Sequence, residues 1–165
     1  MIVMAPDPSQ IQQATQKLQE FHEQQGIISG RGLEALISGA VLGVSRQTWL
    51  LPGVREQGCV LLRGGSADRL SASRPYRIVP PTKDPALRAL SGVGLALAGQ
   101  SVLVFLGTGS LAYGATLQAF SLAASHQADI CFLISFYEAS EEAPFTAQLS
   151  VRPATLALAL GLSAT

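Results

Sequence analysis

Charged side chains are scarce in this sequence. Asp, Glu, Lys and Arg make up 13% of its 165 residues, which is about half the usual share for a soluble domain. Eleven basic and eleven acidic residues cancel to a formal net charge of zero. The chain therefore lacks the basic excess that binds nucleic acid or an anionic membrane, and we expect neither among its partners.

Cysteine and the common enzyme motifs are also rare or absent. Cys59 and Cys131 are far apart and lie inside apolar patterns, which predicts reduced, buried thiols in a cytoplasmic protein. The first residues lack a basic segment followed by a long apolar one, so no signal peptide is expected. The sequence contains no CxxC, HExxH or P-loop, and Ser110 is out of frame for a GxSxG nucleophile elbow.

The longest gap in charge runs from Arg88 to Asp129, between which no Asp, Glu, Lys or Arg occurs. Gly99 and the glycine-rich turn at 107–110 divide this run into pieces too short for a membrane-spanning helix. A helix expected at 111–125 carries no charge, although a helix on a monomer surface normally shows a charged face. We expect a sheet and another subunit to cover it, with an unusually apolar monomer as the alternative.

What is present is enough apolar material for one domain over residues 1–165, since 48% of the residues are hydrophobic. Helical spacing and end signals predict six helices, at about 9–25, 32–42, 54–62, 87–97, 111–125 and 153–160, the first capped by Ser9. Apolar runs predict strands at 102–106 and 130–136. Residues 64–85 are polar and proline-rich, which predicts an exposed or mobile loop.

Residues 100–137 combine these elements as strand, glycine turn, helix and strand, with the turn at Gly107, Thr108 and Gly109. This segment resembles the diphosphate-binding half of thiamine-diphosphate enzymes, and is most similar to the alpha subunit of the 2-oxo acid dehydrogenase E1 component. Further similarities occur in the family's order at 31–35, 49–56, 59–64 and 118–120. The resemblance implies a three-layer α/β/α thiamine-diphosphate-binding fold with a mainly parallel sheet, in a shortened and degenerate form.

The departures from the family concern its metal ligands. The family turn reads Gly-Asp-Gly and its second strand ends in Asn-Asn, and the Asp and one Asn hold magnesium. Here Thr108 takes the Asp position, and Phe136 and Tyr137 take the Asn positions. Magnesium ordinarily requires carboxylate or amide oxygens, so we expect no metal ligands. Among the residues that contact the phosphates in the family, only Arg55 keeps its chemical type. The cofactor-binding positions of this chain would therefore be vestigial. They are Arg55, Gly107, Thr108, Gly109 and Tyr137.

The sequence offers other candidate sites besides these positions. The turn at 107–109 could hold an anion through backbone N–H groups, but we favour a tight turn in which glycine relieves steric strain. Glu138, Glu141 and Glu142 could form a replacement cation site, although a solvated acidic loop is favoured. His22 and His126 have no carboxylate or nucleophile at a recognisable spacing. No catalytic residue is assigned.

Two functional hypotheses follow. The first is a non-catalytic assembly or regulatory protein, without cofactor, that forms a homo-oligomer or pairs with a beta-type E1 subunit. The second is a reduced alpha subunit that works with such a partner in the oxidative decarboxylation of a 2-oxo acid, using thiamine diphosphate and Mg. The resemblance favours the first, because the lost metal ligands belong to this half of the site.

Overall fold

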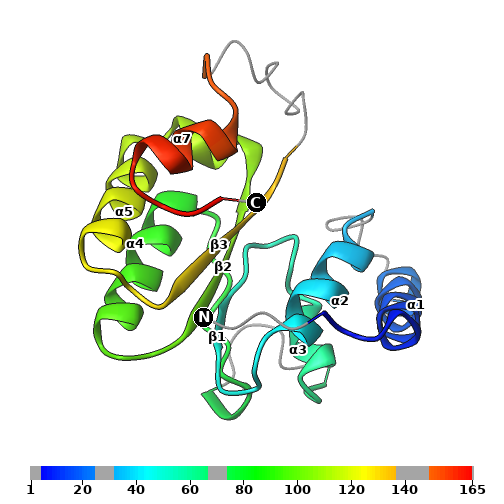
Figure 1. The fold of residues 1–165 in the computed structure, drawn as a ribbon. Helices are drawn as coiled ribbons and strands as arrows, with labels where there is room; N and C mark the ends of the chain where they lie inside the picture. Colours follow the sequence, from blue (N-terminus) through cyan, green and yellow to red (C-terminus); the bar gives the residue numbers. More distant parts are fainter. Residues whose placement is uncertain (1–4, 25–31, 67–73, 137–148, 165) are drawn as a thin grey trace. The chain divides into compact units, whose positions relative to one another are not determined.

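The computed structural model describes residues 5–24, 32–66, 74–136 and 149–164, and it shows a mixed α/β chain (Figure 1). Contacts divide the chain into two compact units, residues 1–83 and 84–165. Each unit is described by itself below. Within the described residues, no helix combines the length and the apolar character needed to cross a membrane.

The first unit begins with helix α1 (Pro8–Gln24), which packs against α2 (Glu34–Gly43). Asp7, and not the predicted Ser9, caps α1, because its carboxylate accepts hydrogen bonds from the Ser9 N–H and hydroxyl, both at 2.8 Å. These bonds lower the pKa of the Asp7 carboxyl. Leu18 and Phe21 are buried on the inner face of the helix, as their spacing predicts.

A short strand, β1 (Trp49–Leu51), was not predicted as a strand. Leu50 forms a parallel bridge with Ile78, in which the Leu50 N–H donates to the Arg77 carbonyl at 2.9 Å. Ile78 is buried and follows the short 3-10 helix η2 (Arg74–Tyr76). The prediction of an exposed or mobile loop over 64–85 is therefore wrong for Ile78, since this apolar residue pairs with β1.

Helix α3 (Cys59–Leu62) is shorter than the predicted helix over 54–62. The Glu56 carboxylate is buried and accepts a hydrogen bond from the Gly53 N–H at 2.8 Å, which stabilises a turn in place of the first helical residues. α3 packs on α2. A side chain at Gly58 would meet the Leu18 methyl carbon Cδ2 at 2.7 Å, so glycine allows the close approach of α1.

The second unit contains the predicted strand, helix and strand. Strands β2 (Val102–Gly107) and β3 (Ile130–Ser135) pair in parallel, with Val102 opposite Ile130 and Gly107 opposite Ser135. The connection between them contains the 3-10 helix η3 (Thr108–Ala112) and helix α5 (Gly114–Ser125). A parallel pair needs such a crossover, because the chain must return to the starting end of the sheet.

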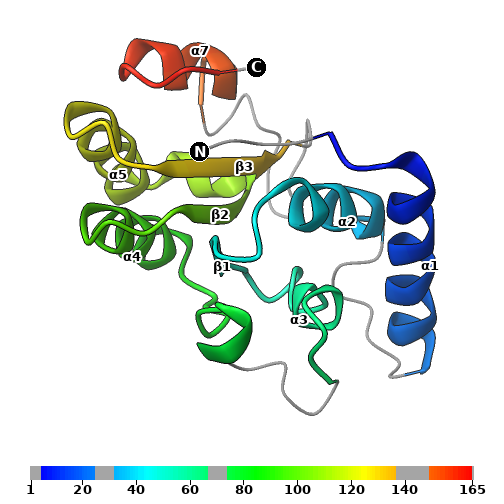
Figure 2. The same ribbon diagram turned by 60° about the horizontal axis from the view of Figure 1, so that its bottom comes forward.

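Helix α4 (Pro85–Leu97) precedes β2 and lies beside α5 in both views (Figures 1 and 2). The Asp84 carboxylate caps α4 by accepting from the N–H groups of Ala86 and Leu87, at 2.8 and 3.1 Å. The last helix, α7 (Pro153–Ala159), has Pro153 at its first turn and ends before Gly161, whose φ of 87° is left-handed. These are the predicted start and stop signals.

The two paired strands differ in burial. Every residue of β2 from Val102 to Leu106 is buried, whereas every residue of β3 is half-buried. β3 lies at an edge of the sheet formed by the described residues. The coarse prediction of an α/β fold with parallel strands is confirmed, and the three-layer thiamine-diphosphate-binding fold stays a prediction.

Candidate functional site

The three turn residues of the predicted site lie together at the carboxyl end of β2. Thr108 is buried, and Gly107 and Gly109 are half-buried. The backbone from Thr108 to Ala112 forms η3, so α5 begins at Gly114 and not directly after the glycine turn. The positive end of the α5 dipole therefore lies at Gly114 and not at the glycine turn. This weakens the interpretation of the turn as an anion site.

The Thr108 hydroxyl has a structural contact. Its Oγ1 donates a hydrogen bond to the Ser135 carbonyl oxygen at 3.1 Å, and the Ser135 hydroxyl donates to the Leu106 carbonyl at 3.2 Å. These two bonds join the carboxyl ends of β2 and β3. At the opposite end of the pair, the Ser101 hydroxyl donates to the Asp129 carboxylate. The position that resembles a metal ligand thus contributes to strand pairing.

Gly107 is not explained by steric strain. Its φ is −90°, which any residue adopts, and a Cβ built on it would meet no heavy atom of the described residues within 4 Å. The preferred interpretation, that glycine relieves crowding in a tight turn, is wrong at Gly107. Among the described residues, none packs against the position that a side chain at Gly107 would take.

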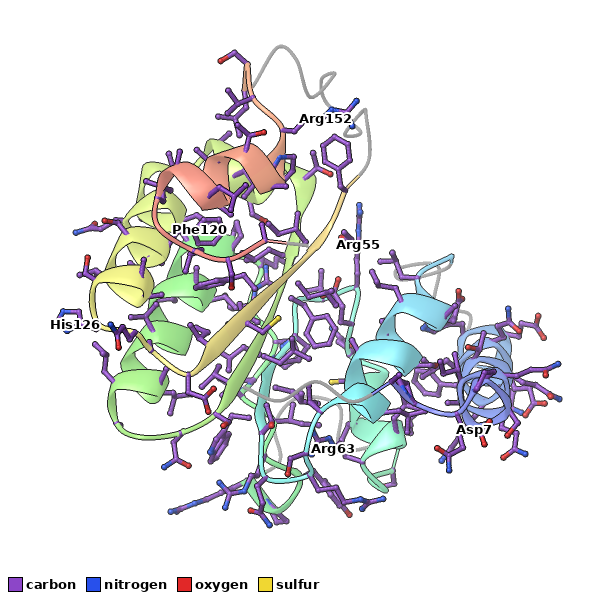
Figure 3. The ribbon with its side chains drawn as sticks, in the orientation of Figure 1. Asp7, Arg55, Arg63, Phe120, His126 and Arg152 are labelled. Atoms are coloured by element: carbon purple, nitrogen blue, oxygen red, sulfur yellow. The ribbon has the colours of Figure 1, made fainter. Side chains whose placement is uncertain are left out.

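Arg55 belongs to the first unit, where it lies in the turn that precedes α3. Its side chain is exposed and extends away from the ribbon (Figure 3), whereas the neighbouring Glu56 is buried. Tyr137 lies outside the described residues, as do Glu138, Glu141 and Glu142. Of the five predicted cofactor positions, the structure brings together the three of the glycine turn.

A buried polar pair was missed by the sequence analysis. The His22 Nδ1 atom lies 3.0 Å from the Glu34 Oε1 atom, and both side chains are buried where α1 packs on α2. Burial raises the pKa of Glu34, but hydrogen bonds from its own N–H and from His22 outweigh this effect and lower the pKa. The sequence shows no carboxylate at a recognisable spacing from His22, and helix packing supplies one from Glu34, 12 residues away.

The remaining candidates have no reactive arrangement. Cys59 is fully buried, which raises the pKa of its thiol to about 12 and keeps the thiol protonated. Burial also raises the pKa of Cys131. His126 is exposed just after α5. Within the described ranges, no three His, Cys, Asp or Glu residues are placed to hold a metal ion.

The comparisons with known proteins add no relative. No protein-family model matches the sequence, and no curated protein matches it significantly. The resemblance to the 2-oxo acid dehydrogenases therefore depends on the motifs between residues 31 and 137.

Proposed function

We propose that the protein is a non-catalytic relative of the 2-oxo acid dehydrogenase alpha subunits, with a role in assembly or regulation. The observation that carries this proposal is the hydrogen bond from Thr108 Oγ1 to the Ser135 carbonyl. A residue that would hold magnesium presents an oxygen lone pair to the ion and is usually a carboxylate. Thr108 is neutral, and its hydroxyl proton is directed to the protein backbone.

The end of β3 supports the same proposal. The strand runs through apolar residues to Ser135, and the following Phe136 is 38% exposed. Phe136 takes one of the two Asn positions of the family and has no amide oxygen, and Tyr137, at the other position, lies outside the described residues. A diphosphate needs cations close to its charges, so a site without metal ligands would hold the cofactor weakly.

The assembly role draws on the uncharged surface of the second unit. α5 has no charged residue, and it exposes Gln118, Ser121 and Ser125. The half-buried edge strand β3 provides a second uncharged face. The partner would be a second copy of the chain or a beta-type subunit, since both could cover an edge strand by pairing with it.

Two small residues of α5 belong to the core of the chain and not to this surface. Ala119 and Ala123 are 0% and 2% exposed within a single copy. Their small side chains serve packing within the chain, where α5 lies against α4, and not contact with another subunit. An interface on α5 would use its exposed polar residues instead.

The alternative function is a reduced alpha subunit that binds thiamine diphosphate and Mg when a partner supplies the missing ligands. The surroundings of Gly107 favour it, because no described atom lies within 4 Å of where a side chain at this position would begin. Under this alternative, Gly107 and Gly109 would lie against the diphosphate and Arg55 would neutralise part of its charge.

The two functions are separated by cofactor titration of the protein as it assembles in its host cells. We expect native mass spectrometry to find an oligomer without cofactor, and calorimetry to detect no binding of thiamine diphosphate with Mg. A complex that retains the cofactor would overturn the proposal.

A gain-of-ligand variant tests whether the old pocket is open. Thr108→Asp combined with Tyr137→Asn restores the family's ligand types, and Thr108→Asn with the same second change is the matched control. We expect no cofactor binding in either variant. Binding by the Asp variant alone would favour the reduced-enzyme alternative.

A further inference from the structure

Helix α4 of the second unit is apolar on its outer side as well as on the side that packs in the core. A helix on a protein surface normally carries charged or polar side chains on its outer side. In α4 this side is instead a stripe of leucines and small residues at helical spacing, called here the α4 stripe. It consists of Leu87, Leu90, Ser91, Gly94 and Leu97.

The leucines of the α4 stripe are exposed within a single copy of the chain. Leu87 is 56% exposed and Leu97 is 52% exposed. α5, which lies beside α4, contains no charged residue (Figures 1 and 2). Between Asp84 and Asp129, Arg88 is the one charged side chain, and it is buried. A single exposed leucine is ordinary, but several in one stripe on an uncharged surface mark a contact site.

Gly94 provides a second, independent observation. It lies inside α4 and is exposed, at a position where glycine is less favourable for a helix than alanine. A Cβ built on Gly94 would meet no heavy atom within 4 Å among the described residues that surround the helix. Packing within the described chain therefore does not explain this glycine. The close approach of a helix from another molecule would explain it.

We propose that the α4 stripe is the contact between two copies of this chain, related by a two-fold axis that crosses the middle of α4. The proposal rests on the assembly role proposed above, and it names the surface and the partner. In a two-fold interface, residue i of one copy contacts residue j of the other, and j contacts i.

The spacing of the α4 stripe fits such an axis. An axis at the level of Gly92 places Leu90 opposite Gly94 of the partner subunit, and Leu87 opposite Leu97 of the partner subunit. Each Leu90 would then fill the space left by a glycine, as side chains of one helix fit between those of another in packed helix pairs. The stripe is thus complementary to itself in shape.

The absence of charge selects a second copy as the partner. A charged surface placed against the stripe would lose water from its charges and gain no counter-charge. The outer side of α1, for example, exposes Lys17, Glu20 and Glu23, so it would not fit. A second α4 stripe brings leucines and no charge, and the apolar area of both copies is buried together.

The size of this surface predicts a reversible dimer. α4 has 13 residues, which gives a length of about 20 Å. Together with a neighbouring helix about 9 Å away, it covers roughly 400 Å², whereas a standard interface buries about 800 Å² on each partner. We therefore expect a dimer Kd of about 1–100 μM.

The test is sedimentation velocity of the full chain over about 1–300 μM. We expect the natural protein to change from monomer to dimer across this range. Leu87→Lys should raise the dimer Kd at least about tenfold, whereas the matched control Leu158→Lys, from a leucine of α7 that is 60% exposed, should leave it unchanged. A natural protein that stays monomeric, or a dimer that Leu87→Lys does not weaken more than Leu158→Lys does, would overturn the proposal.

Mixing two variants tests the pairing of residues across the axis. Leu87→Lys and Leu97→Glu should each be monomeric alone. In their mixture, the new lysine faces the new glutamate at one end of the contact, and the natural leucines meet at the other end, so a mixed dimer should form. Native mass spectrometry identifies the mixed dimer by its mass. A mixture that stays monomeric would overturn this pairing.

A third variant tests the role of the glycine. Gly94→Gln fills the space in the stripe with an uncharged side chain that favours a helix. We expect the dimer Kd to rise at least about tenfold and the thermal unfolding midpoint of the monomer not to fall. Unchanged dimerisation, or a lower midpoint without a change in Kd, would show that Gly94 does not serve a contact between copies.

The native mass spectra separate this proposal from the proposed function. The number of subunits tests the α4 stripe, and the presence of bound thiamine diphosphate tests the loss of cofactor chemistry. A monomer without cofactor would overturn the contact between copies and support the non-catalytic function. A dimer that retains the cofactor and dissociates in Leu87→Lys would do the reverse.

Discussion

The two units of this chain differ in how many charged side chains they contain and in which polar groups they bury. Residues 1–83 include nine basic and six acidic side chains, and residues 84–165 include two basic and five acidic ones. The first unit buries charged or titratable groups, among them His22, Glu34 and Arg63, and connects them to partners on other segments. Among its described residues, the second unit buries one charged side chain, Arg88, within a core of apolar strands and helices, and hydroxyl groups join its strand ends.

The difference shows what stabilises each unit. In the first, buried polar contacts add to an apolar core, so stability there should also depend on pH and on single polar side chains. In the second, apolar burial dominates, so stability should respond to volume and to introduced charge. The following predictions use changes that affect one unit and leave the other intact.

The largest effect is expected in the apolar core of the second unit. Ala119→Asp places a carboxylate at a site that is 0% exposed, and a buried unpaired charge should destabilise the unit by about 3–5 kcal/mol. Ser121→Asp, on the exposed side of the same helix, should change stability by no more than about 0.5 kcal/mol. Urea unfolding followed by circular dichroism checks both, and equal losses would contradict the burial of Ala119.

The next effect concerns the buried pair of the first unit. His22→Ala leaves the Glu34 carboxylate without one of its hydrogen-bond partners, which should cost about 2–3 kcal/mol. The single tryptophan, Trp49, lies in this unit, so its fluorescence during urea unfolding reports the loss. The double variant with Glu34→Gln should lose less than the sum of the single variants, and simple additivity would refute the coupling.

The same pair predicts a dependence on pH. Because the pKa of Glu34 is lowered in the folded chain, its contribution is complete above the usual carboxyl value of about 4.3 and is lost as the pH falls through the lowered value. The natural protein should therefore lose more stability in acid than Glu34→Gln does. Urea unfolding followed by Trp49 fluorescence at pH 3 to 7 measures the stability of both proteins. The same loss of stability in acid for both would contradict this prediction.

A smaller effect is expected where the strands of the second unit are joined. Thr108→Val keeps the size of the side chain but removes the hydrogen bond to the Ser135 carbonyl, which should cost about 1 kcal/mol. Thr108→Ser retains the hydroxyl and should recover most of that loss. Hydrogen exchange of the β3 amides is the measurement, and equal exchange in Thr108→Val and Thr108→Ser would exclude a role for the bond.

The smallest effect is expected at Gly107, the residue before Thr108. Gly107→Ala adds a methyl group to a backbone with an ordinary φ and with no described atom within 4 Å of the added carbon, so the free energy of unfolding should change by less than about 0.5 kcal/mol. Thermal unfolding checks this value. A loss above about 1 kcal/mol would restore the steric explanation for the glycine.

Much of the second unit could be predicted because its signals are local. The apolar runs of β2 and β3, the proline that begins α7 and the glycine after it all lie within the elements they define. The half-burial of β3 could not be predicted, since its composition resembles that of the buried β2.

The first unit was harder to predict because its contacts are made between distant residues. Glu56 ends the expected helix early through a bond to Gly53, and Ile78 pairs with Leu50 from within a proline-rich segment. The pair His22–Glu34 and the contacts of Arg63 join segments 12 to 18 residues apart. None of these contacts has a periodic signal in the sequence.

The position of β3 at the edge of the described sheet also has a consequence for a newly made chain. From Ile130 to Ser135 the strand contains no proline, lysine or other charged residue, which are the features that usually prevent one sheet edge from pairing with another. Such an edge aggregates with similar edges at high concentration. A partner that paired with this strand, as the proposed assembly role requires, would remove that route to aggregation.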